Sequence, residues 1–158
     1  MDRISQWWQT QRLRFPLVKT LVINQDNGPE NQSRRTQFLK RIVSFVAEQH
    51  INVRLAYYPP YHSKYNPIER CWGILEQHWN GCLLLDIETV LGFAQSMTWR
   101  GHAPTAQLID TVYQTGIRLT QGAMAVVESC VHRLDGLQRW FVDILYTDAV
   151  LLKTILLE

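Results

Sequence analysis

The chain lacks the long apolar runs that mark membrane proteins. A membrane-spanning helix needs about 20 predominantly apolar residues. The longest candidate, at 149–157, is shorter than that, and Asp143, Asp148 and Lys153 interrupt its surroundings. The N-terminus has no apolar signal core. We therefore expect a soluble protein with no membrane partner.

The chain also has few cysteines and only a small excess of positive over negative charge. The three cysteines, Cys71, Cys82 and Cys130, form no C-x-x-C pair. This excludes a disulfide framework and the common structural zinc patterns, and it predicts reduced thiols in a cytoplasmic protein. The formal charge of +2 is too small to diagnose nucleic-acid binding. With 158 residues, 46% of them hydrophobic, the chain can bury the core of one domain, or of one domain with an appendage.

The first half of the chain has the sequence pattern of a strand, a helix and a second strand. The apolar run 18–24 predicts a buried strand, which the turn residues 26–29 end. Residues 36–49 have one apolar face at helical spacing, and 51–58 predict the second strand, ended by Pro59 and Pro60. Such a unit gives parallel strands. Because parallel strands end at the same edge of a sheet, we expect Asp26 beside the loop after the second strand.

That loop leads into a further helix. Asn66 is a favourable N-cap, Pro67 suits the first helical position, and Glu69 follows in the first turn. An apolar stripe, expected to be buried in the core, runs along this helix: Ile68, Trp72, Leu75 and Trp79.

The remaining residues predict further helices. Residues 87–98 have one apolar side, and residues 123–134 and 137–157 are both expected to be helical. The chain changes character at 117, so we expect residues 117–158 to form a helical, apolar tail of unclear origin. The predicted fold class is α/β, with a βαβ unit plus helices and a mainly helical C-terminal tail.

Asp26 and Glu69 are the candidate catalytic pair. Two carboxylates at one sheet edge suit metal-dependent phosphoryl transfer, because Mg²⁺ prefers hard oxygen ligands and usually takes one or two carboxylates. Simpler roles are also open: Asp26 as a turn former, and Glu69 as a capping-box residue that bonds back to the amide of Asn66.

Two segments carry a resemblance to a known family: LVINQDNGPEN and VRLAYYPPYHSKYNPIERCWGILEQHWNG. With the upstream Trp7-Trp8 pair, they resemble the Asp-Asp-Glu transposases of bacterial insertion sequences, of the ISAzo-thirteen type. The resemblance covers residues 5–116. The chain departs from the family pattern at Tyr61-His62, where Gly-Thr is usual, and at Tyr65, which replaces a Trp.

The resemblance implies an RNase H-like fold and a site of three acids that bind two divalent ions, Mg²⁺ or Mn²⁺. The family nicks element ends and joins them to target DNA. Asp26 resembles the second acid and Glu69 the third. The strand of the first acid and the N-terminal DNA-binding part do not fit ahead of Asp26. We therefore expect residues 1–116 to be the C-terminal part of a catalytic domain, inactive in isolation.

Four further residues are candidate DNA contacts: Lys64, His62, Arg34 and Arg35. Lysine and arginine side chains suit phosphate contacts, and a solvated loop or helix face is the alternative. The main functional hypothesis is a truncated DNA transposase. The alternatives are a non-catalytic fragment that binds DNA, full-length transposase or a second copy of itself, and a degenerate product of poor stability.

Overall fold

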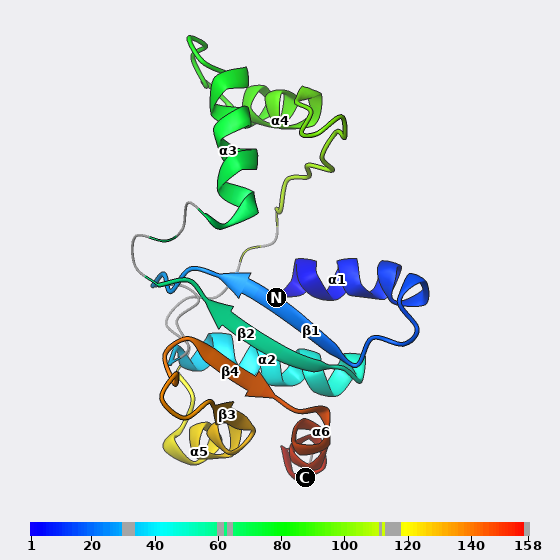
Figure 1. Ribbon diagram of the computed structural model, residues 1–158, viewed down its shortest axis with the longest axis vertical. Helices are drawn as coiled ribbons and strands as arrows, with labels where there is room; N and C mark the ends of the chain where they lie inside the picture. Colours follow the sequence, from blue (N-terminus) through cyan, green and yellow to red (C-terminus); the bar gives the residue numbers. More distant parts are fainter. Residues whose placement is uncertain (30–33, 60–61, 63–64, 111, 113–117, 157–158) are drawn as a thin grey trace. The chain divides into compact units, whose positions relative to one another are not determined.

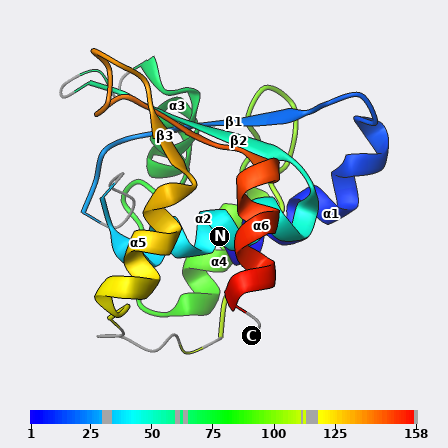
Figure 2. The same cartoon turned by 90° about the horizontal axis from the view of Figure 1, so that it is seen from below.

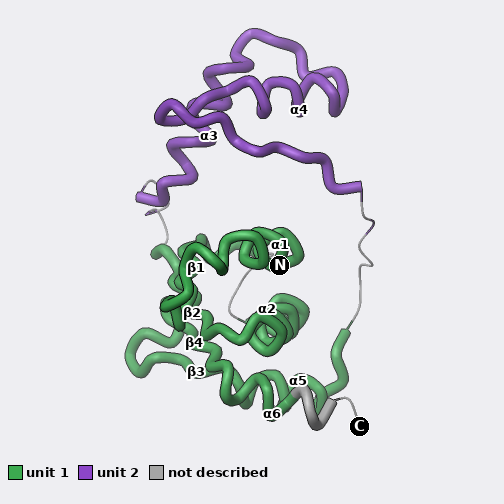
Figure 3. Tube along the Cα trace, turned by 90° about the vertical axis from the view of Figure 1, so that its right-hand side faces the viewer, with its two compact units in different colours: residues 1–60, 116–158 green, residues 61–115 purple. Residues whose placement is uncertain are grey.

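The computed structural model describes residues 1–29, 34–59, 62, 65–110, 112 and 118–156 (Figure 1). It divides into two compact units, residues 1–60 with 116–158 (unit 1) and residues 61–115 (unit 2), which are coloured separately in Figure 3. The elements of unit 1 are α1 (Asp2–Gln11), the 3₁₀ helix η1 (Arg12–Arg14), β1 (Thr20–Gln25), α2 (Thr36–Gln49), β2 (Asn52–Tyr57), α5 (Gln121–Ser129), β3 (Val131–Arg133), β4 (Phe141–Ile144) and α6 (Tyr146–Leu156). Those of unit 2 are α3 (Pro67–His78) and α4 (Ile87–Ser96).

Unit 1 is built on a four-stranded mixed sheet in the order β1-β2-β4-β3. β1 and β2 are parallel, with Thr20 opposite Asn52 and Gln25 opposite Tyr57. β4 is antiparallel to both β2 and β3. The parallel βαβ unit that the sequence predicted is therefore confirmed, with boundaries displaced by one or two residues. The α/β class, consistent with a partial RNase H-like fold, is confirmed as well.

The core lies between the sheet and α2. Leu39, Ile42 and Val46 of α2 are fully buried, and so is Leu55 of β2. Their spacing on α2 is that of one helical face. α1 and α2 lie on the same side of the strands (Figure 3). Seen from below, α5 and α6 lie beside α2 (Figure 2), and both contact it.

The opposite face of the sheet is polar. The register aligns Val22, Arg54, Asp143 and His132 in one row across the strands. Arg54 binds Asp143 through two hydrogen bonds of 2.6 Å. His132 Nε2 lies 2.6 Å from a carboxylate oxygen of Asp148. Alternation of apolar and polar side chains along β2 and β4 thus separates the core face from this charged face.

The helices predicted over 123–134 and 137–157 are wrong in part. Residues 131–133 and 141–144 are strands, and the helices here are α5 and α6. The apolar face from Leu137 to Leu145 suits a helix, but Val142 and Ile144 also alternate with Asp143 at strand spacing. Pairing of β4 with β2 buries Val142 and Ile144 completely. Tertiary pairing therefore overrides the helical pattern.

In unit 2, α3 begins as the sequence predicted, with Asn66 as N-cap and Pro67 in the first turn. Only Leu75 of its apolar stripe is buried. Trp72 is 56% exposed, so its assignment to the core is wrong. α3 packs against α4, where His78 Nε2 lies 3.0 Å from Ser96 Oγ. Two short helices cannot enclose a stripe of this width, which explains the exposed tryptophan.

No helix among the described residues has both the length and the apolar character needed to cross a bilayer.

Cys130 gives a prediction for alkaline stability. Burial of this side chain, with the nearby Asp148 carboxylate adding to it, raises the pKa of the thiol to about 11. An unfolded thiol ionises near pH 8.5. The contribution of the protonated, buried thiol to the free energy of unfolding is therefore fully present below about pH 8.5 and is lost as pH rises towards 11. We expect the free energy of unfolding, from urea titrations, to fall by on the order of 2 kcal/mol over this window.

The Cys130→Ala variant should lose less stability over the same window, whereas Cys82→Ala, which removes an exposed thiol, should behave as the parent chain. Burial also raises the pKa of Tyr57, to about 12. In Cys130→Ala the free energy of unfolding should therefore still fall as the pH rises above 10. An equal alkaline loss in Cys130→Ala and in the parent chain would contradict the assignment.

Candidate active site at the carboxyl ends of the parallel strands

The carboxyl ends of β1 and β2 are held together at one edge of the sheet. The amide of Tyr58 donates to the Gln25 carbonyl at 2.9 Å, just beyond the last register pair. Burial raises the pKa of Tyr57 to about 12, and its hydrogen bond with the Gln25 side chain acts in the opposite direction. Gln25 and Tyr57 thus join the two strands directly ahead of the residues that leave the sheet.

Asp26 is the first residue after β1, and it is exposed. The predicted position of Asp26, at the same sheet edge as the loop after Tyr58, follows from the parallel register of β1 and β2. An exposed carboxylate at the carboxyl end of a parallel strand is accessible to an ion or substrate, since ligands of open α/β sheets bind outside these strand ends.

The two predicted arginines lie where α2 begins. Arg34 and Arg35 are exposed, and Arg35 is the N-cap of α2. The Arg35 guanidinium donates to the Pro29 carbonyl at 2.7 Å, which ties the turn after Asp26 to the helix. Two cations at the positive end of a helix dipole disfavour the helix itself. They also concentrate positive potential beside the turn, which favours an anionic ligand there.

Glu69 lies in the first turn of α3 and is exposed. The Asn66 side chain accepts from the amide of Ile68 at 3.4 Å, and the amide of Glu69 donates to the Asn66 carbonyl at 3.1 Å. Within the described residues, the Glu69 carboxylate forms no hydrogen bond with the Asn66 amide. The capping-box alternative for Glu69 is therefore not what the structure shows.

His62 is exposed and stacks on Tyr65, with ring centroids 5.8 Å apart. Its carbonyl accepts from the Tyr65 amide at 3.0 Å. Lys64, the other predicted DNA contact in this loop, lies outside the described residues. His62 therefore has a local structural role in the turn before α3, and its exposed ring leaves contact with a ligand open.

The donor set fits a hard divalent cation. Asp26 and Glu69 offer carboxylate oxygens, which Mg²⁺ and Mn²⁺ prefer. Asp26 belongs to unit 1 and Glu69 to unit 2, so the structure describes each within its own unit. Among the described residues, no group of three or more His, Cys, Asp or Glu side chains forms a metal cluster.

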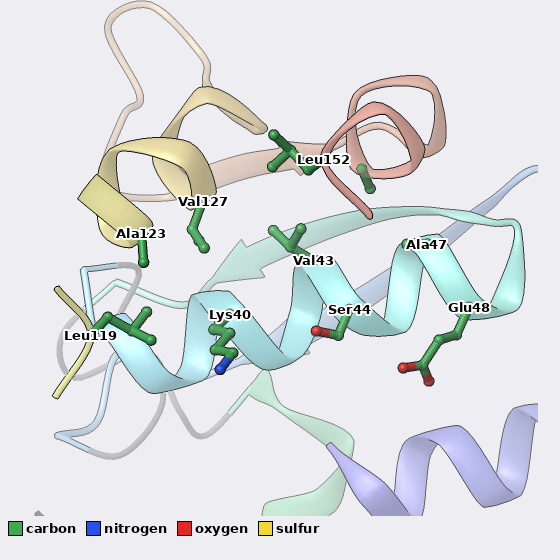
Figure 4. Close-up of a pocket in the computed structure, with 10 residues that line it drawn as sticks. Lys40, Val43, Ser44, Ala47, Glu48, Leu119, Ala123, Val127 and Leu152 are labelled. Carbon is green, nitrogen blue, oxygen red and sulfur yellow. The ribbon is translucent and has the colours of Figure 1, made fainter. Parts of the chain in front are cut away.

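A separate apolar groove is lined by α2, α5 and α6 (Figure 4). It has a volume of about 340 Å³, and its apolar lining includes Val43, Ala47, Val127 and Leu152. None of the predicted site residues lines it. The groove and the strand ends are thus different features of unit 1.

Sequence reasoning missed the pair formed by Gln25 and Tyr57. Tyr57 lay in the predicted strand 51–58 and Gln25 directly after the predicted strand 18–24, but neither was expected to support the site. The available signal was their shared position at the end of a strand, directly ahead of a turn.

Comparison with known protein families now identifies the chain. A family model described as the Rhodopirellula transposase DDE domain matches residues 1–145. No curated protein and no solved structure shows significant similarity to the chain. The match runs past residue 116, where the recognisable motifs end, and it includes the strands β3 and β4. The chain therefore belongs to the family of DDE-domain transposases of the ISAzo-thirteen type.

Proposed function

We propose that the chain supplies the second and third acids of a metal-dependent site for DNA transposition. The observation that carries this is the family match together with the placement of Asp26 at the carboxyl end of β1, beside the end of β2. Asp26 and Glu69 would hold the divalent ion, Mg²⁺ or Mn²⁺. All proposed site residues lie within 1–116; beyond them, β3 and β4 complete the sheet and α5 and α6 contact α2. Action on DNA suits a cytoplasmic protein, and this location is part of the proposal.

Phosphodiester cleavage needs little covalent participation from protein side chains. A divalent ion held by Asp26 and Glu69 would supply the charge that activates the attacking oxygen and stabilises the leaving oxygen of a phosphodiester. The chain itself would position the reacting groups through these two carboxylates, and the Gln25–Tyr57 contact keeps the strand ends together. Arg34, Arg35, His62 and Lys64 would contact phosphates of the element ends or of the target DNA.

Manganese binding tests this assignment. Because Mn²⁺ is paramagnetic, ion held by Asp26 should broaden the backbone amide resonances of Asn27 and Gly28 in a two-dimensional NMR spectrum. Broadening centred instead on Asp143 and Asp148, or none at all, would contradict the proposed site.

The 158-residue chain by itself is expected not to cleave DNA. Two of the family's three acids are assigned, and loss of one metal ligand removes most of the activity of such a site. Supercoiled plasmid incubated with the chain and Mg²⁺ should remain supercoiled, as it does in a reaction with EDTA. Mg²⁺-dependent nicking that disappears in Glu69→Gln would show that this chain already contains a complete site.

A second candidate function is favoured by the position of β1 at the edge of the sheet. In the described residues β1 pairs only with β2, and Thr20–Gln25 contains no charged residue and no proline. Val22, at its centre, is 52% exposed. Unprotected edge strands recruit further strands. This candidate is a non-catalytic chain that binds full-length transposase by adding a strand at β1.

A pull-down with tagged full-length transposase tests the second candidate. Val22→Lys should reduce retention of the chain several-fold, because a charged edge residue opposes strand addition. The control is Val112→Lys, which alters an exposed valine of unit 2. Equal retention of both variants, or no association at micromolar concentration, would eliminate this candidate.

A further inference from the structure

The exposed side of α1 and η1 carries a row of side chains that the proposed site does not use. Arg3, Trp7, Gln11 and Arg14, here called the N-terminal stripe, follow at spacings of three or four residues. Trp8, about 100° round the helix from Trp7, is buried in the core. The stripe therefore lies beside the apolar side of the helix, which is already occupied.

Hydrogen bonds hold the stripe in place. Arg3 donates to Gln6 Oε1 at 2.8 Å, and Arg14 donates to Gln11 Oε1 at 2.9 Å. Trp7, between them, is 48% exposed, and its ring is tilted by 44° against that of Trp8. A large aromatic side chain held partly in solvent between two oriented guanidinium groups has no evident role in the core.

Positive charge is concentrated in the same segment. Residues 1–19 contain four basic side chains, Arg3, Arg12, Arg14 and Lys19, in a chain whose formal net charge is only +2. The one acid, Asp2, lies 3.8 Å from Arg41 of α2, so another cation offsets its charge. The N-terminal stripe therefore presents net positive potential together with an aromatic surface.

We propose that the N-terminal stripe binds single-stranded DNA. A base stacks on the indole of Trp7, and Arg3 and Arg14 contact the phosphates on either side. Proteins that bind single strands without sequence preference combine aromatic stacking with cationic phosphate contacts in this way. The choice of DNA as partner rests on the proposed function, since DNA transposition exposes unpaired strand ends.

An anionic membrane surface is the competing ligand for a basic segment with tryptophan. A helix that lies in a membrane interface inserts its apolar face. In α1 that face is taken, because Ile4 and Trp8 pack into the core cluster of unit 1. The remaining outer face of α1 is polar apart from Trp7. The exposed apolar side chains that follow, Leu13, Phe15 and Leu17, lie beyond α1 and do not extend its apolar face, so the stripe itself favours the nucleic acid.

Fluorescence anisotropy with a labelled twelve-nucleotide oligo-dT tests the proposal on the full chain. Trp7→Ala should weaken binding roughly tenfold, from the loss of one stacked base. Trp7→Phe should restore most of the affinity, because it keeps an aromatic face. The matched control is Trp72→Ala, which removes an exposed tryptophan from α3 and should leave binding unchanged.

Salt dependence separates the arginines from the tryptophan. The double variant Arg3→Gln, Arg14→Gln removes two phosphate contacts, so the slope of log K against log salt should become shallower by about 1.4. Trp7→Ala should leave this slope unchanged. Circular dichroism of each variant checks that α1 remains folded.

The inference is overturned if Trp7→Ala binds as the parent chain does, if Trp72→Ala weakens binding equally, or if phosphatidylserine vesicles bind the stripe in preference to the oligonucleotide. Mn²⁺ broadening at Asn27 is measured on the same samples. If that broadening persists while Trp7→Ala has no effect on DNA binding, only the stripe is refuted. If it is absent in the parent chain, the proposed metal site fails independently of the DNA result.

Discussion

Replacing Ile144 with aspartate is expected to unfold unit 1. Ile144 is fully buried at the end of β4, opposite Val53 of β2 and Val131 of β3. Loss of its side chain alone, in Ile144→Ala, should cost about 2–5 kcal/mol. An unpaired carboxylate in the same place adds a desolvation penalty of several kcal/mol. Since domains of this size are stable by about 5–15 kcal/mol, the sum removes most or all of the folded population.

Urea titration followed by circular dichroism measures the effect. The control is Leu151→Asp, which places the same carboxylate on an exposed position of α6 and should leave the midpoint nearly unchanged. If Ile144→Asp unfolds at the same midpoint as the parent chain, residues 141–144 are not part of the central sheet. Ile144→Ala gives a measurable value even where the aspartate variant cannot be purified.

The contrast between α2 and β4 shows which parts of the fold can be predicted from sequence. α2 was predicted to the residue because its apolar face spans the whole helix and a cluster of turn residues, 26–29, precedes it. β4 has four residues, and its hydrophobic spacing suits a helix as well as a strand. Its strand conformation arises from contact with β2, far away in sequence. No local pattern contains that information.

One local signal for the hairpin was nevertheless present. Asp135-Gly136 lies between β3 and β4, and Gly136 has a φ of 76°. Asp-Gly dipeptides mark turns because glycine adopts positive φ without strain. Taken with the alternation in Val131–Arg133, this turn argues against two long helices. The prediction followed the apolar face from Leu137 onward and did not use this turn signal.

The candidate site follows from topology more than from motif. Two parallel strands must end at one edge, so the place of Asp26 could be deduced once the βαβ unit was recognised. The contact of Gln25 with Tyr57 could not, because it depends on register, and a slip of one residue would turn each side chain to the other face. The spacing of Glu69 left a capping-box role open, because spacing permits a hydrogen bond without requiring it; the structure shows no such bond among the described residues.

Removing either proposed ligand is expected to release manganese. Asp26→Asn and Glu69→Gln keep the size of the side chain and remove its charge, which a divalent ion requires. Substitution of groups that merely support a ligand already weakens metal binding by about 10–100-fold. Each variant should therefore raise the Kd for Mn²⁺ by at least about tenfold, as measured by isothermal titration calorimetry.

The effect of Glu69→Gln on Mn²⁺ broadening near Asp26 tests whether the two carboxylates share one ion. If both carboxylates hold the same ion, Mn²⁺ broadening at Asn27 and Gly28 should disappear although these residues are unchanged. Glu76→Gln removes another exposed carboxylate from α3 and should leave the broadening intact. Broadening that survives Glu69→Gln but not Asp26→Asn would mean that Asp26 binds the ion without Glu69. The shared site would then be refuted, while the placement of Asp26 at the end of β1 would stand.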